Sequence, residues 1–91
     1  TIEISRKTFA DIQGFRTMVE VDAVERIFDH VNDEDVEALR IHNAAMRDAP
    51  TIADASEADF AFHLRLVGTL RNDAVLEVYR IMKPVIIRIM E

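Results

Sequence analysis

At 91 residues the chain has room for one small domain, which hides only about 60–65% of the surface that its unfolded form exposes. Hydrophobic residues make up 49% of it, and two glycines, two prolines and no cysteine are typical of a helical globular protein without disulfides or thiolate metal sites. Seventeen acidic residues against eleven basic ones give a net charge of −6, which opposes the positive field that nucleic-acid binding needs.

The chain shows neither a basic-then-apolar N-terminal segment nor an apolar run of about 18–20 residues. We therefore expect a cytoplasmic protein with no membrane contact. Four helical segments are predicted, since strand-like alternation with hairpin turns is missing. The expected fold class is all-α.

The first helix is predicted at about 9–30. Thr8 followed by Asp11 resembles a capping box, and apolar residues then recur at helical spacing. These apolar residues are Ile12, Phe15, Val19, Ala23 and Ile27.

An acidic run predicts the start of the second helix. Asn32 is a good cap residue, and the acids at 33–35 suit the positive end of the helix dipole. The helix should end before Pro50. Its core side is predicted to consist of Val36, Leu39, Ala45 and Met46.

The third helix is predicted to begin near Thr51 or Asp54 and to end near Leu70. On its helical wheel one broad arc is apolar and contains Phe60, Phe62, Leu64, Leu66, Val67 and Leu70. The opposite arc is expected to be solvated and contains Glu57, Ala58, Ala61, Arg65, Gly68 and Thr69.

The fourth helix is predicted from Ala74 onward, with Asn72 or Asp73 as its cap. Pro84 lies inside it, where proline removes one backbone hydrogen bond and is expected to kink the helix. Val78, Ile81, Met82, Val85 and Ile89 are predicted to share one side. A helix apolar on much of its circumference needs several partners, so we expect a fragment of a longer chain whose later helices are missing.

Asp59 and His63 are the first candidate site, because both lie in the middle of the apolar arc of the third helix. A buried carboxylate must be hydrogen-bonded, paired with a cation or bound to a metal. One interpretation is that Asp59 and His63 contact each other directly and form a structural pair in the core. The other is a shared divalent metal, since side chains at i and i+4 project in parallel.

Arg16 and Glu20 repeat this arrangement on the first helix, again four residues apart among apolar neighbours. They form either an internal ion pair or a site at which Arg16 grips an anionic ligand. His30 and His42 are weaker ligand candidates, because His30 suits a helix C-terminus and His42 lies among polar residues. Gly14 and Gly68 indicate close helix packing.

Three motifs together resemble the effector-binding C-terminal domain, called FCD, of FadR-type GntR transcriptional regulators. They are RTMVE at 16–20, DFAFH at 59–63, and RNDAVL at 71–76 leading into EVYRIMKP at 77–84. Their order and spacing agree with the family's "R..lE", "D..FH" and "gN..L...y..l.p" patterns. The resemblance covers about Thr8 to Glu91.

The resemblance implies an antiparallel helical bundle. It implies that Asp59 and His63 bind a divalent metal, zinc or nickel, together with two histidines beyond residue 91, so that this fragment holds the metal weakly. It also implies that Arg16 meets a carboxylate effector, with Glu20 and Asn72 as possible supporting residues. We further expect a homodimer, as indicated weakly by Leu76 and Ile87, which are predicted to be exposed. DNA binding is expected through a separate winged helix-turn-helix domain.

We therefore expect a sensing domain for a small organic acid, and no enzyme activity. One rival is a hydrolase in which the Asp59–His63 metal activates water. Beyond Glu20, however, no general base is in evidence. The second rival is a metal-free helical interaction module in which the same pair is structural.

Overall fold

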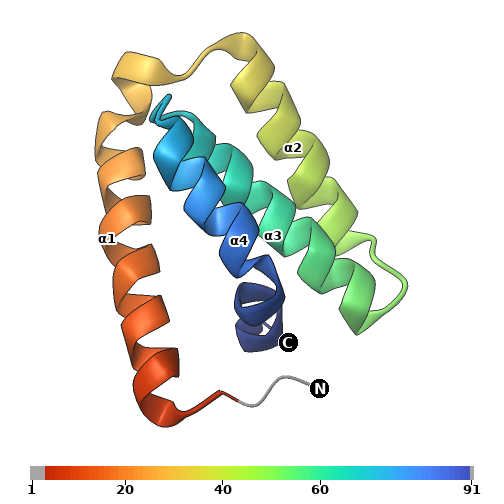
Figure 1. Ribbon diagram of the computed structural model, residues 1–91. Helices are drawn as coiled ribbons and strands as arrows, with labels where there is room; N and C mark the ends of the chain where they lie inside the picture. The colour runs from red at the N-terminus through yellow and green to blue at the C-terminus, as the bar shows by residue number, and fades with distance from the viewer. Residues whose placement is uncertain (1–3, 91) are drawn as a thin grey trace.

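A computed structural model describes residues 4–90, and all of its regular elements are α-helices. They are α1 (Arg6–His30), α2 (Asp33–Arg47), α3 (Ile52–Gly68) and α4 (Asp73–Met90). Successive helices reverse direction, and α3 lies centrally, in contact with each of the other three (Figure 1). The all-α helical bundle is thus confirmed. None of the helices in the described part of the chain is both long and apolar enough to cross a membrane.

Capping residues set most of the helix starts. Asn32 accepts the backbone N–H of Asp35, whose carboxylate accepts the N–H of Asn32, so α2 begins with a full capping box. Thr51 caps α3, and the Asn72 side chain accepts the N–H of Val75 at the start of α4. All three were predicted.

The predicted start of the first helix is wrong. The cap is Ser5, whose hydroxyl accepts the backbone N–H of Thr8, and Asp11 pairs with Lys7 instead of closing a capping box. Serine is as good a cap as threonine, and the earlier start adds one turn to the helix.

The core lies where α3 and α4 meet α1. Its buried members are Phe60, Val67, Tyr79 and Ile86. Ile12, Phe15 and Val19 of α1 pack against it, as their spacing predicted, and the Phe15 and Tyr79 rings lie 6.1 Å apart between centroids. The first helix therefore buries its predicted side.

The predicted core side of α4 is correct in part: Met82 packs against the core, and Val85 and Ile89 are partly buried. It is wrong for its other two members. Val78 and Ile81 are 38% and 72% exposed, whereas Tyr79 and Ile86 are completely buried. Leu76 and Ile87, expected to be exposed, pack against the core. Apolar residues surround most of this helix, so periodicity alone could not select the face that α3 and α1 cover. Pro84 lies inside α4, and Figure 1 shows the helix changing direction in its C-terminal half.

The predicted solvated arc of α3 is also wrong, because α2 packs along it. Thr69 is 1% exposed and Arg65 is partly buried. On α2, Leu39 and Met46 are partly buried as predicted, but Val36 and Ala45 are exposed. In their place α2 buries Asp35.

The two glycines do not mark close helix contacts. A Cβ atom added at Gly14 would meet nothing within 4 Å, and one at Gly68 would lie 3.8 Å from the Leu76 side chain, an ordinary contact. The packing role predicted for them is therefore wrong.

Candidate functional site

His63 lies between two carboxylates at the contact of α3 with α1. Its Nε2 atom is 3.0 Å from Oδ1 of Asp59, one helical turn earlier. Its Nδ1 atom is 2.5 Å from Oε1 of Glu20 on α1. Both ring nitrogens therefore have a partner, and the imidazole is fixed in orientation from two sides.

Glu20 on α1 joins α3 through Oε1 and α4 through its second carboxylate oxygen, Oε2. Oε2 accepts hydrogen bonds from the Tyr79 hydroxyl at 3.0 Å and from Nε of Arg16 at 3.2 Å. Arg16 in turn donates from Nη1 to the Gln13 side chain at 2.9 Å. We call Arg16, Glu20, Asp59, His63 and Tyr79 the polar network.

Burial decreases along this network from the core outward. Tyr79 is fully buried, the side chains of Arg16 and Glu20 are 11% and 16% exposed, and those of Asp59 and His63 are 28% and 27% exposed. The inner members thus have little access to water, which makes their mutual hydrogen bonds necessary. The Asp59–His63 end remains within reach of a solute.

The network favours its ionised members. Burial by itself would raise the pKa of Glu20, but hydrogen bonds from His63 and Tyr79 and the charges of His63 and Arg16 hold that pKa below its usual range. The hydrogen bond to Glu20 raises the pKa of His63 against the opposing effect of burial, and Asp59 adds to the increase. Burial and the Glu20 carboxylate raise the pKa of the Tyr79 hydroxyl, which therefore stays a donor.

The sequence placed two pairs correctly but missed the link between them. Asp59 and His63 point inward and touch, as do Arg16 and Glu20, so the direct pairing proposed for each is present. The Glu20–His63 contact spans 43 residues, and no local spacing signals it. Tyr79 was recognised only as part of a motif. A tyrosine in a strongly apolar helix could have indicated a buried hydroxyl with a hydrogen-bond partner.

A cleft of about 580 Å³ opens beside the network. Arg16 and Glu20 form part of its polar wall, and Val21, Val24 and Leu66 form much of its apolar wall. Asp59 and His63 are not among its lining residues. Glu25 also lines the cleft, which therefore presents one guanidinium, two carboxylates and an apolar surface, next to the imidazole but not directly on it.

Asp59 and His63 suit two neighbouring positions around a metal ion. Bonds of about 2.1 Å from a metal to nitrogen and to oxygen end about 3.0 Å apart at the right angle of octahedral coordination, and about 3.4 Å apart at the tetrahedral angle that zinc prefers. The Nε2 and Oδ1 atoms are 3.0 Å apart. Within residues 4–90 no group of three or more histidine, cysteine or acidic side chains is placed to hold an ion, since Glu20 and Asp59 lie at opposite nitrogens of the ring. The pair fits part of a metal site.

The other predicted residues lie elsewhere. Asn72 serves as a helix cap and lines a separate cleft with Met18 and Val75. His30 is the last residue of α1, as its suitability for a helix C-terminus predicted, and its backbone carbonyl accepts a hydrogen bond from Arg71. His42 lines a third cleft on the far side of α3.

Comparison with known proteins identifies the family of the chain. A sequence-family model described as "FCD domain" matches residues 11–91, which is most of the chain. No curated protein and no solved structure gives a match. The matched region contains every member of the polar network.

Proposed function

The chain belongs to the FCD domain family, and on that basis we propose that it is the effector-sensing domain of a FadR-like, GntR-type transcriptional regulator. The observation that carries the proposal is the polar network, in which one glutamate connects Arg16 of the cleft wall to the Asp59–His63 pair. A ligand at one end of this network changes the environment of the other end.

Arg16 is the proposed contact for a small organic acid. It lines the cleft, and its side chain is held by Glu20 and Gln13, so little rotamer entropy remains to be lost on binding. A guanidinium recognises a carboxylate through paired hydrogen bonds. The valines and the leucine of the cleft would accept the apolar part of the acid.

Asp59 and His63 are the proposed metal ligands of this domain. Glu20 would orient the ring by accepting the Nδ1 proton, which leaves Nε2 as the coordinating atom. A zinc or nickel ion bound there would supply a Lewis acid for the carboxylate of the effector. Two protein ligands hold such an ion weakly, so further ligands are required from outside residues 4–90.

In this proposal the ligand shifts a conformational equilibrium and is not chemically changed. An effector can move the equilibrium only by its difference in affinity between two arrangements, here those of a homodimer in a cytoplasmic regulator. DNA contact is assigned to a separate domain, which agrees with the net charge of −6. A reaction at the site would need a base other than Glu20, which is occupied by three partners.

The alternative is a metal-free interaction module. The direct Asp59–His63 bond favours it, because the pair is satisfied without an ion. Elemental analysis of the intact protein distinguishes the two proposals: a stoichiometric divalent metal that disappears in Asp59→Ala supports sensing at a metal, and a metal-free protein supports the module.

The sensing function is tested on the intact regulator by following operator binding during titration with divalent metal and candidate acids. We expect an acid-dependent change in operator affinity that the double variant Asp59→Ala, His63→Ala loses. His30→Ala, at the end of α1, is the matched control and should respond normally. An unaltered response of the double variant would refute the assignment.

A further inference from the structure

The cleft on the far side of α3, which His42 lines, has a volume of about 420 Å³ and lies between α2, α3 and α4. It lies on the side of α3 opposite Asp59 and His63, because Ala61, Arg65 and Gly68 line it and project about half a turn away from that pair. It therefore shares no residue with the polar network.

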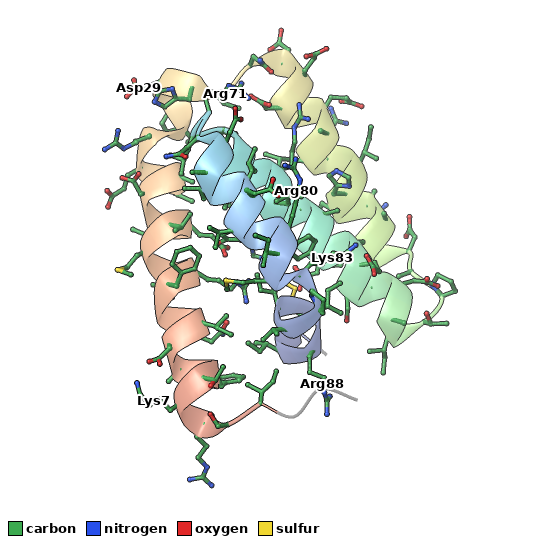
Figure 2. The ribbon with its side chains drawn as sticks, viewed as in Figure 1. Lys7, Asp29, Arg71, Arg80, Lys83 and Arg88 are labelled. Atoms are coloured by element: carbon green, nitrogen blue, oxygen red, sulfur yellow. The ribbon has the colours of Figure 1, made fainter. Side chains whose placement is uncertain are left out.

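The cleft is lined by positive side chains in an acidic protein. Three arginines, Arg65, Arg71 and Arg80, are among its eight lining residues, and no carboxylate is. Figure 2 shows Arg71 at the turn before α4 and Arg80 along α4 on the side toward α2. The positive charge is therefore concentrated within the cleft.

A buried carboxylate holds two of these arginines in place. Asp35, 1% exposed, accepts from Nη2 of Arg71 at 2.6 Å and from Nη2 of Arg65 at 3.0 Å. One carboxylate cannot neutralise two guanidinium groups. Arg80 adds a third, and its partner Glu77 is 3.6 Å away in an exposed pair that contributes little.

The backbone at Arg71 adopts a conformation that is costly for any residue other than glycine. Its φ of 56° lies in the left-handed region, which glycine adopts at lower cost. The Arg71 guanidinium bonds Asp35 and the His30 carbonyl, which offsets this strain. The guanidinium is thereby positioned before any ligand arrives.

One donor in the cleft has no acceptor. Nε of Arg65 is buried and makes no hydrogen bond, the one such side-chain atom within residues 4–90. A buried donor without a partner is costly, and such atoms often mark the place of a missing ligand or water. The geometry suits an oxygen-bearing anion, which the planar fork of arginine recognises.

We propose that this cleft binds the oxyanion group of a small molecule, a phosphate or a carboxylate, through Arg65, Arg71 and Arg80. The anion would balance the excess charge over Asp35. A rotation of the Arg65 side chain, which is 39% exposed, would give its buried Nε–H an acceptor on the anion. The site is separate from the proposed effector cleft, so either assignment can fail without the other.

The test is a titration of the full chain with inorganic phosphate, and separately with succinate, at constant ionic strength. The side-chain Nε–H signals of the arginines are followed by NMR. We expect a saturable downfield shift of the Arg65 signal. Arg80→Gln should weaken binding about tenfold, the effect of one charge-assisted hydrogen bond.

Arg40→Gln is the matched control, because Arg40 forms an equivalent exposed i,i+3 pair with Glu37 at 3.7 Å but does not line the cleft. It should change the affinity less than twofold. Arg65→Lys keeps the charge, removes the Nε–H and should also weaken binding. Saturation with phosphate alone assigns a phosphoryl ligand, and saturation with both anions or with succinate alone includes carboxylates. The absence of saturation with either anion, or equal losses in Arg80→Gln and Arg40→Gln, would overturn the proposal.

Discussion

Replacing Glu20 by alanine should destabilise the fold far more than its place in a single i,i+4 ion pair suggests. The change removes the acceptor for Arg16, His63 and Tyr79 at once. Tyr79 is fully buried and the Arg16 side chain is 11% exposed, so water cannot replace the lost carboxylate. The remaining guanidinium would be a partly buried, unpaired charge.

The expected loss is about 3 kcal/mol, the lower end of the range for removing one partner of a buried ion pair. For a domain of this size, about 4–8 °C of melting temperature per kcal/mol converts this to a decrease of roughly 12–24 °C. Urea unfolding of the full chain, followed by far-ultraviolet circular dichroism, measures the free energy directly.

Asp22→Ala is the matched control on the same helix. Asp22 pairs with Arg26 at 2.9 Å with the same spacing, but these side chains are 46% and 59% exposed. Its loss should cost below about 1 kcal/mol. If the two variants differed by less than about 1 kcal/mol, the account of Glu20 as the centre of the polar network would be refuted.

Three further predictions address single interactions. Tyr79→Phe keeps the ring and loses the hydrogen bond from the hydroxyl to Glu20. Its free energy of unfolding, measured by urea denaturation, should be about 1–2 kcal/mol lower than that of the wild type. Burial would raise the pKa of Asp35, but its bonds with the arginines lower that pKa below the ordinary value of 3.8. The stability gained by ionisation of Asp35 is therefore present above pH 3.8 and is lost as the pH falls below it. The difference in unfolding free energy between wild type and Asp35→Asn should shrink in acid. Val67→Ala should lower the melting temperature clearly more than Val24→Ala, because Val67 is 1% and Val24 55% exposed; equal effects would contradict the described core.

Local signals in the sequence predicted the features that neighbouring residues build. The caps at Asn32 and Thr51 were readable because a cap bonds a backbone N–H only three residues away. The inward placement of Asp59 and His63 was readable because the helical period fixes which residues share a side. Family membership followed from the order of short motifs, and the family match confirms it.

Helical periodicity predicted the wrong face where several faces of a helix were equally apolar. On α4 periodicity correctly chose Met82 but also chose the exposed Val78 and Ile81, and it missed the buried Tyr79 and Ile86. On α3 it assigned Arg65 to solvent, although that side chain binds Asp35 of α2. Periodicity describes one helix at a time and contains no information on where the neighbouring helices lie.

By itself the sequence therefore determined four helices, their approximate ends and two inward i,i+4 pairs, since each depends on hydrogen bonds or spacing within a few residues. Only the tertiary structure decided that Glu20 bonds His63 and that Asp35 holds Arg71, across 43 and 36 residues. Such contacts depend on the rotation and offset of packed helices. The rotation and offset are set by the packing of the whole core. The polar network around Glu20 and the arginine cluster around Asp35 could therefore be recognised only in the assembled bundle.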